Sequence, residues 1–188
     1  KKRSRKRNRY YIKMNVQHTI EKTISRDCYV STFFIEDKNL LENIKQKIID
    51  KANNSPLSYK TNVKAKFTGF ESLSLEPETK EFAMQIKPFS NIVCNKKTAM
   101  KECWGNIYHK DDYAVLHHHR ACTGFSGILY LSNEGPGTYF KDFDLTIKEE
   151  YGKVVLFEPM LLHEVKPSNL QTTRITMAFN CYEVSPWE

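Results

Sequence analysis

The stretch YAVLHHHRACTGFSG, residues 113–127, carries the strongest evidence in this sequence about how the chain folds. It places three of the chain's six histidines side by side, as His117, His118 and His119. In a helix the three side chains would point in three directions. In a strand side chains alternate, so His117 and His119 share one face and His118 points the other way. Two imidazoles on one strand face form half of a metal site, although a register shift of one residue would exchange these roles.

The composition fits one globular domain of ordinary size. The chain has 188 residues, of which 40% are hydrophobic and 12% aromatic, enough to bury a core. No stretch is long and apolar enough to span a membrane, and no apolar signal segment lies near residue 1. The five cysteines are odd in number and have no CxxC spacing, which favours free thiols in a reducing compartment. We therefore expect an intracellular, cytoplasmic protein without a membrane partner.

The basic excess of the chain is concentrated at its start. Residues 1–9, KKRSRKRNR, hold seven of the 29 Lys and Arg residues, and the other 22 balance the 22 Asp and Glu residues. Such a run is typical of a solvated arm, so we interpret residues 1–10 as a disordered basic tail. It would serve nuclear targeting or contact with nucleic acid, or it acts only as a solubility tail.

The region between residues 11 and 97 is predicted to contain a strand and helices that pack on a core. Residues 28–37 are β-branched and aromatic, and Asp37 is a candidate N-cap for a helix over residues 39–54. A second helix is predicted over residues 76–89, with Pro77 in its first turn. From residue 98 to 188 short apolar segments alternate with turn signals, which favours an antiparallel sandwich or barrel within the same overall domain.

The segment RITMAFNCYE, residues 174–183, is predicted to be the last strand of this sandwich. Alternation puts one set on a polar inner face, namely Arg174, Thr176, Ala178 and Asn180. The opposite face, packed in the core, carries Ile175, Met177, Phe179 and Cys181. An arginine inside a barrel needs an anion, either the carboxylate of a ligand or an internal Asp or Glu.

A third histidine, His163, follows an apolar segment eleven residues before Arg174. One hairpin turn would place these two residues on neighbouring antiparallel strands. Two histidines close in sequence, one distant histidine and a downstream arginine are typical of the facial triad of non-haem iron(II) oxygenases.

Several motifs extend this pattern over residues 100–182. They are Trp104-Gly-Asn106, His117-x-His119, SGILYL at 126–131, Gly137-Thr-Tyr-Phe140, His163-Glu-Val-Lys-Pro167 and Arg174-x-Thr176. Through them the sequence resembles the 2-oxoglutarate- and Fe(II)-dependent oxygenase superfamily, and most closely its prolyl-hydroxylase-like branch. The resemblance implies a fold that is mainly β with flanking helices, a double-stranded β-helix or jelly roll. It also implies Fe(II), 2-oxoglutarate as cosubstrate and O₂.

The resemblance assigns the metal ligands incompletely. His117 and His163 match the two histidine ligands of the superfamily. Most members have Asp or Glu where this chain has His119. We predict that His119 is the third ligand; the alternatives are that it is retracted or that Asp142 or Asp144 completes the triad.

The resemblance also implies a set of cosubstrate residues. Arg174 matches the residue that binds the C5 carboxylate of 2-oxoglutarate, and Tyr130 matches a tyrosine that hydrogen-bonds the same carboxylate. Thr176 assists, while Asn106 and Asn180 line the pocket. No catalytic residue beyond the metal ligands is implied.

The predicted function is hydroxylation of a protein or peptide side chain, by analogy with prolyl hydroxylases. One alternative is a cupin-like three-histidine iron dioxygenase that uses no 2-oxoglutarate. It explains His119 but leaves Arg174, Tyr130 and Thr176 without a role. The other alternative is a non-catalytic metal-binding jelly-roll module tethered by its basic tail. Neither the substrate nor the oligomeric state follows from the sequence.

Overall fold

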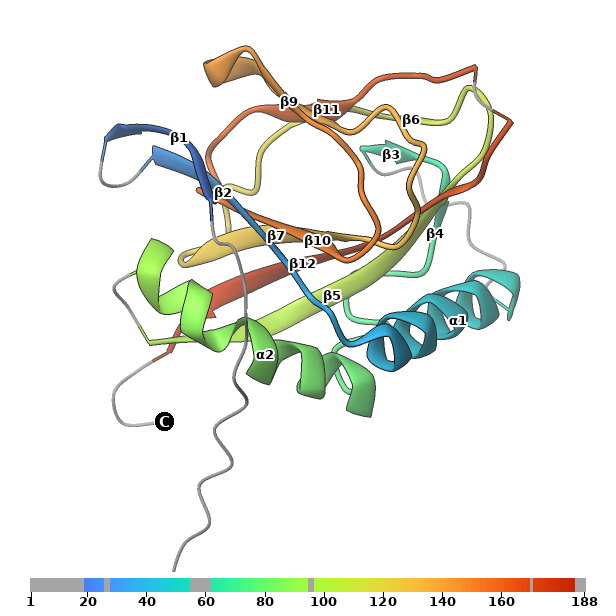
Figure 1. The fold of residues 1–188 in the computed structure, drawn as a ribbon, viewed down its shortest axis with the longest axis horizontal. Helices are drawn as coiled ribbons and strands as arrows, with labels where there is room; N and C mark the ends of the chain where they lie inside the picture. Colours follow the sequence, from blue (N-terminus) through green and yellow to red (C-terminus); the bar gives the residue numbers. More distant parts are fainter. Residues whose placement is uncertain (1–18, 26–27, 55–61, 95–96, 170, 185–188) are drawn as a thin grey trace, which may run out of the picture.

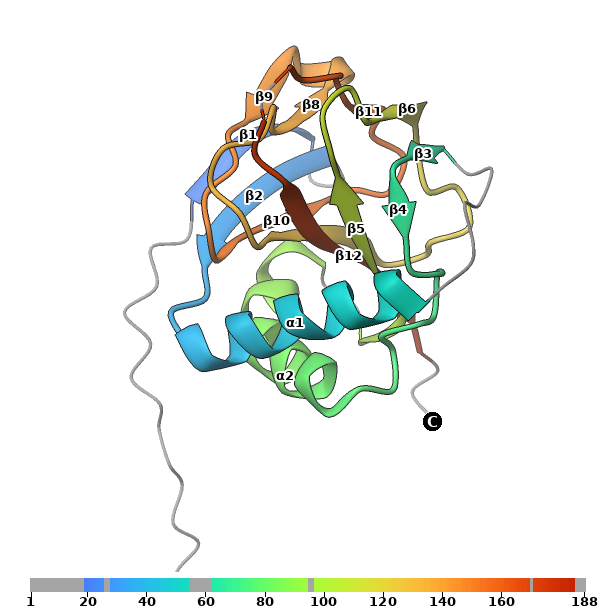
Figure 2. The same cartoon turned by 90° about the vertical axis from the view of Figure 1, so that its right-hand side faces the viewer.

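The chain forms two antiparallel sheets that face each other, with two helices on the outer side of the larger sheet (Figures 1 and 2). The computed structural model describes residues 19–25, 28–54, 62–94, 97–169 and 171–184. The basic tail at residues 1–10 lies outside these ranges, so its predicted disorder and its roles in nuclear targeting or nucleic-acid contact stay predictions.

The seven-stranded sheet has the order β1-β2-β10-β7-β12-β5-β4. Its strands are β1 (Thr19–Ser25), β2 (Cys28–Phe34), β4 (Lys66–Phe67), β5 (Thr98–Tyr108), β7 (Phe125–Tyr130), β10 (Lys153–Phe157) and β12 (Arg174–Glu183). The five-stranded sheet has the order β3-β6-β11-β8-β9. Its strands are β3 (Val63–Lys64), β6 (Tyr113–His117), β8 (Thr138–Phe140), β9 (Leu145–Ile147) and β11 (His163–Val165). A short 3-10 turn, Lys141–Phe143, joins β8 to β9.

Both predicted helices are present. Helix α1 (Lys38–Asn54) begins after Asp37, whose carboxylate accepts a hydrogen bond from the backbone N–H of Leu40 at 3.0 Å, as an N-cap does. Helix α2 (Pro77–Val93) begins at Pro77, where the missing N–H has no helical partner to lose. The helices pack on the outer face of the large sheet through buried apolar residues that include Leu40, Leu41, Ile44, Ile48, Phe82, Ile86 and Phe89.

The alternation predicted for the last strand is confirmed. In β12 the side chains of Ile175, Met177, Phe179 and Cys181 belong to the core between the large sheet and the helices. Gly127 on β7 leaves room for the Phe179 ring, because a Cβ atom there would lie 2.2 Å from its Cζ. A second core fills the space between the two sheets, with Ile128, Tyr130 and Phe157 on one side and Phe140 on the other.

The prediction that His163 and Arg174 lie on neighbouring strands is wrong. His163 begins β11 in the small sheet, whereas Arg174 begins β12 in the large sheet. The connection between them crosses from one sheet to the other instead of forming a hairpin. The two residues therefore face the same interior from opposite sides, which brings a histidine and an arginine around one cavity.

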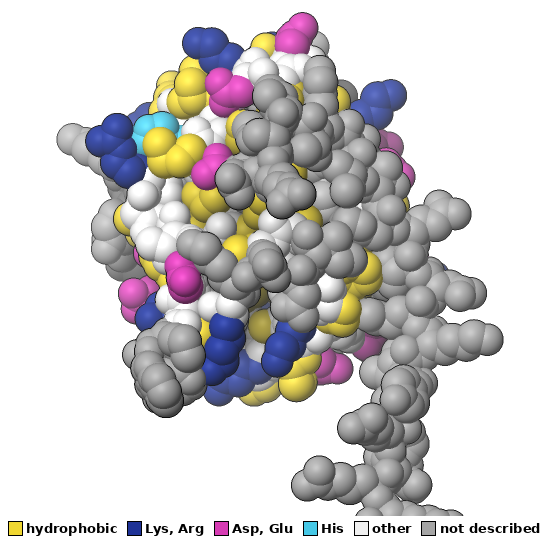
Figure 3. Space-filling view, turned by 90° about the vertical axis from the view of Figure 1, so that its left-hand side faces the viewer, with side chains coloured by type: hydrophobic (Ala, Val, Ile, Leu, Met, Phe, Trp, Pro, Cys, Tyr) yellow, Lys and Arg dark blue, Asp and Glu magenta, His cyan; other side chains and the backbone are white. Residues whose placement is uncertain are grey.

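Strands from the N-terminal half are also part of the two sheets, since β1, β2 and β4 lie in the large sheet and β3 in the small one. The boundary drawn at residue 98 between supporting region and core stays a prediction. No helix in the described part of the chain is long and apolar enough to cross a membrane. The face shown in Figure 3 mixes basic, acidic and hydrophobic side chains.

Candidate active site

Three neighbouring strands of the large sheet, β5, β12 and β7, form the floor of the site. Alternate residues share a face, and the register places them directly opposite one another, so the side chains form rows across the sheet. The rows are Tyr108 with Arg174; Asn106 with Thr176 and Tyr130; Trp104 with Ala178 and Ile128; and Glu102 with Asn180 and Ser126.

The small sheet supplies the histidines that face this floor. His117 ends β6 and His163 begins β11, and the two are directly paired. His119 lies just beyond β6, where its backbone N–H donates to the carbonyl of Pro159 at 2.8 Å. The ring centroids are 4.3 Å apart for His117 and His163, and 5.0 Å for His119 and His163. One ring nitrogen from each histidine lies within 4.8 Å of the others, which is close enough for a single metal ion.

Hydrogen bonds determine which nitrogen of each ring is available. Nδ1 of His117 donates to the carbonyl of Val115 at 2.7 Å, and Nδ1 of His163 donates to that of Leu161 at 2.9 Å, because a carbonyl only accepts. Nδ1 of His119 lies 2.7 Å from Oδ1 of Asn180. The Nε2 atoms therefore remain as the metal-facing donors, as in histidine sites whose other nitrogen is held by the protein.

The electrostatics favour neutral imidazoles, the form that binds a metal. Burial lowers the pKa of His117 and His163 below the ordinary value, and it lowers the pKa of His119 to about 4. The close approach of the rings adds to this effect for His119 and His163, because a proton on one ring repels a proton on another.

The two carboxylates considered as third ligand lie outside the histidine cluster. Asp142 accepts a hydrogen bond from the backbone N–H of Leu162 at 2.8 Å, and Asp144 accepts one from the Tyr139 hydroxyl at 2.9 Å, both at exposed positions. Among the described residues, no carboxylate joins the histidine cluster. His118 is half-buried beside the cluster, and its Nδ1 has no hydrogen-bond partner.

Arg174 lies at the far end of the cavity that the three histidines line. It is 4% exposed, and its Nε donates to the buried carboxylate of Glu149 at 2.8 Å. Its guanidinium also lies 4.5 Å from the ring centre of Tyr108. The internal ion pair considered from the sequence is therefore present, yet it does not satisfy the arginine, because Nη1 is buried without a partner.

Other predicted cosubstrate residues divide between two places. Thr176 and Asn106 line the cavity with Arg174, and Oδ1 of Asn106 is buried without a partner. Tyr130 is fully buried and donates its hydroxyl to Thr138, a cavity residue, at 2.8 Å. Asn180 instead contacts His119. The unpaired donor of Arg174 fits an anionic ligand, and the histidines fit a divalent metal.

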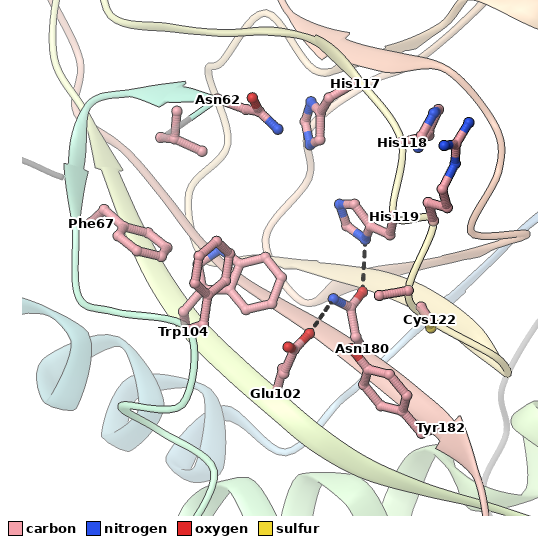
Figure 4. A pocket seen from close by; sticks show the side chains of 14 residues that line it. Asn62, Phe67, Glu102, Trp104, His117, His118, His119, Cys122, Asn180 and Tyr182 are labelled. Atoms are coloured by element: carbon pink, nitrogen blue, oxygen red, sulfur yellow. Dashed lines mark hydrogen bonds between the residues drawn. The ribbon is translucent and has the colours of Figure 1, made fainter. Parts of the chain in front are cut away.

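A second cavity opens beside the histidines and was not predicted from the sequence (Figure 4). Its aromatic wall consists of Phe67, Phe70 and Trp104, with ring centroids 4.9 Å apart for Phe67 and Phe70 and 5.2 Å for Phe70 and Trp104. Phe70 is 50% exposed. Glu102 and Tyr182 also line this cavity. Alternation in residues 98–108 could have identified Glu102 and Trp104, because they share a face with Asn106.

Comparisons with known proteins agree with this architecture. Neither a family model nor a curated protein matches the chain. Among solved structures, a viral collagen prolyl hydroxylase from Paramecium bursaria Chlorella virus-1, in complex with 2-oxoglutarate, aligns with a TM-score of 0.66 and 17% identity over 86% of this chain and 100% of that chain. HygX from Streptomyces hygroscopicus, with nickel and 2-oxoglutarate bound, aligns with a TM-score of 0.65 and 13% identity over 84% of each chain.

A prolyl-4-hydroxylase from Pseudomonas putida aligns with a TM-score of 0.61 and 12% identity, over 90% of this chain and 93% of that chain. The predicted fold class is confirmed by these neighbours. This chain has the jelly-roll fold of the 2-oxoglutarate- and Fe(II)-dependent oxygenases, with a cluster of three histidines placed to hold a metal.

Proposed function

We propose that this protein is a 2-oxoglutarate- and Fe(II)-dependent oxygenase whose metal is held by Nε2 of His117, His119 and His163. The observation that carries the proposal is that these histidines and an incompletely paired Arg174 line one cavity between the two sheets. Fe(II) with 2-oxoglutarate would supply the activation of O₂ that hydroxylation of a C–H bond requires.

The residues of the chain would then bind, orient and shield the cosubstrate. Nη1 of Arg174 would donate to the far carboxylate of 2-oxoglutarate, in a charge-assisted hydrogen bond. Thr176 offers a further polar contact, Nδ2 of Asn106 donates to the Thr176 hydroxyl at 3.4 Å, and the Tyr130 hydroxyl donates to Thr138. A three-histidine dioxygenase without 2-oxoglutarate would leave Nη1 of Arg174 with no role.

We also propose that the substrate is a side chain of a protein or peptide, with prolyl side chains as the first candidates. The aromatic cavity beside the histidines supports this, because Pro-rich segments dock in grooves with aromatic walls. Half-exposed Phe70 places part of that wall at the surface, where an extended chain has access. Two of the structural neighbours are prolyl hydroxylases, whereas HygX was solved with hygromycin B, so a small molecule is the competing substrate class.

The first experiment is an anaerobic titration with Fe(II) and then 2-oxoglutarate, followed by visible absorption. A metal-to-ligand charge-transfer band that requires both additions is the expected result. Arg174→Ala should weaken the 2-oxoglutarate step and spare the Fe(II) step. Iron binding without any band would instead favour the three-histidine dioxygenase or a structural metal.

The substrate is tested by mass spectrometry on Pro-containing peptides incubated with the loaded enzyme. The expected product gains one oxygen atom, and Phe70→Ala should reduce its yield while 2-oxoglutarate binding is retained, because Phe70 lines the aromatic cavity and not the Arg174 cavity. The control is Met84→Ala, which removes an exposed apolar side chain on α2. Turnover that occurs with hygromycin B and with none of the peptides would overturn the peptide proposal.

A further inference from the structure

Glu102 is connected to the metal-facing histidines through a single amide. Nδ2 of Asn180 donates to Oε2 of Glu102 at 2.6 Å, and Oδ1 of Asn180 lies 2.7 Å from Nδ1 of His119 (Figure 4). The hydroxyl of Ser126 also donates to Oδ1 of Asn180, at 2.7 Å, and its oxygen lies 2.8 Å from Nδ1 of His119. Glu102, Asn180 and Ser126 are the cross-strand row nearest to His119, so the strand register itself sets these contacts.

Because Ser126 has one hydroxyl proton and donates it to Asn180, its oxygen can only accept from His119, and Glu102 sets the polarity of the rest of this hydrogen-bond chain. An ionised Glu102 can only accept, so it must face the NH₂ group of Asn180 and not its oxygen. The amide oxygen is then directed at His119, and an amide oxygen can only accept. Nδ1 of His119 must therefore carry the proton, which leaves the lone pair on Nε2.

We propose that Glu102 is a positioning residue, whose carboxylate orients Asn180 and thereby holds His119 in the tautomer that presents Nε2 to the metal. The inference rests on the proposed metal site. A neutral imidazole has two tautomers, and only one of them offers Nε2 as a ligand. A carboxylate ligand has no such ambiguity, so the need for Glu102 follows from the histidine at position 119.

His119 differs from its two partners in how its tautomer is determined. His117 and His163 donate to backbone carbonyls, which can only accept a hydrogen bond. Asn180 is a side-chain amide that could rotate by half a turn and offer its NH₂ group to His119 instead. Glu102 prevents this, because the rotated amide would place an oxygen against the carboxylate.

The test measures the affinity of the full chain for Co(II), without 2-oxoglutarate or turnover. Trp104 serves as a fluorescence probe, because its ring centroid lies 6.2 Å from that of His119; Trp187→Phe removes the second tryptophan of the chain. In this background Glu102→Gln should weaken Co(II) binding about tenfold, the lower end of the range for residues that hold a metal ligand. Glu81→Gln, at an exposed position of α2, removes the same charge and should bind Co(II) normally.

The double variant Glu102→Gln with Asn180→Asp provides the specific check. The introduced glutamine amide would donate to the introduced aspartate, and that carboxylate would accept from His119. A hydrogen-bond acceptor then faces Nδ1 of His119 again, although the amide and the carboxylate have exchanged positions. Co(II) affinity should return to within about threefold of the parent, well inside the roughly tenfold loss of the single variant. A purely structural role for Glu102 would not produce this recovery.

The outcomes separate this inference from the metal site on which it rests. Unchanged Co(II) affinity in Glu102→Gln, or no recovery in the double variant, would overturn the role of Glu102. His119→Ala should lose most of the affinity; if it binds Co(II) as tightly as the parent, the proposed metal site itself fails. Thermal unfolding of each variant identifies any loss of affinity that arises from a loss of fold.

Discussion

Replacement of Arg174 by Met should destabilise the protein and weaken 2-oxoglutarate binding for two separate reasons. Glu149 and Arg174 are each 4% exposed and form an ion pair at 2.8 Å. Loss of one partner of a buried pair leaves an uncompensated charge, which costs about 3–5 kcal/mol of unfolding free energy. A lost charge-assisted hydrogen bond to the cosubstrate carboxylate is worth roughly 1.5–3 kcal/mol, or about 10- to 100-fold in the dissociation constant of 2-oxoglutarate.

A second substitution separates these effects. The Ser132 hydroxyl donates to Glu149, and Glu149→Gln keeps an acceptor for it. The same substitution removes the uncompensated negative charge that Arg174→Met leaves at position 149. The double variant Arg174→Met with Glu149→Gln should therefore regain at least about 2 kcal/mol of the lost stability, because a buried pair replaced on both sides is often nearly neutral. It should not regain 2-oxoglutarate affinity, since Nη1 is still missing.

The pH dependence has a defined sign. Burial raises the pKa of Glu149, and Arg174 opposes that rise, so the pKa of Glu149 should rise further in Arg174→Met. A folded-state pKa above the unfolded value means that stability is retained at low pH and lost as the pH rises through the folded-state pKa. The deficit of Arg174→Met relative to the double variant should therefore shrink on acidification.

Urea unfolding of the metal-free protein at several pH values, together with calorimetric titration of the Ni(II)-loaded protein with 2-oxoglutarate, measures both quantities. Two results would refute the reasoning. If the double variant is no more stable than Arg174→Met, the uncompensated charge of Glu149 is not the cause of the lost unfolding free energy. If both variants bind 2-oxoglutarate like the parent, Arg174 does not anchor the cosubstrate.

Three further predictions concern the scaffold. Asp37→Ala should lower the unfolding free energy by about 1 kcal/mol in urea titrations, because the N–H of Leu40 loses its cap; an equal loss in Asp37→Asn would argue against capping. Gly127→Ala should cost about 1–3 kcal/mol and lower Tm, since its Cβ would lie 2.2 Å from Cζ of Phe179; Phe179→Leu should relieve part of the loss. Burial raises the pKa of Cys103 to about 12, so peptide mapping should find this thiol unlabelled by a thiol reagent until the protein unfolds, and rapid native labelling would contradict its burial.

The sequence was sufficient to predict the parts of this fold that depend on local periodicity. The helices, the Asp37 cap and the two faces of β12 follow from alternation or helical spacing over a few consecutive residues. The proximity of His117 and His119 follows in the same way, although His119 lies just beyond the strand and is held by Pro159. The resemblance to a known family then assigned roles to His163 and Arg174.

The remainder of the site depends on which strands become neighbours, and no local pattern contains that information. Glu149 lies on the connection between β9 and β10 and reaches Arg174 from 25 residues away. The placement of His163 was mistaken because a short connection suggested a hairpin, whereas the chain crosses between sheets. Glu102 was detectable as a member of the Asn106 face, but its contact with Asn180 required the register of β5 and β12.

The row arrangement across β5 and β12 has a consequence for how this protein can diversify. Glu102 and Tyr108 are six residues apart on one strand, which corresponds to about 20 Å at the usual rise of a β-strand. The Arg174 end and the Glu102 end are therefore far enough apart for substitutions at each to act nearly additively. A library confined to Phe70 and Tyr182 should change what the protein accepts and leave the opposite end of the sheet as it is. The same fold can thus acquire new substrates through substitutions in the aromatic cavity alone.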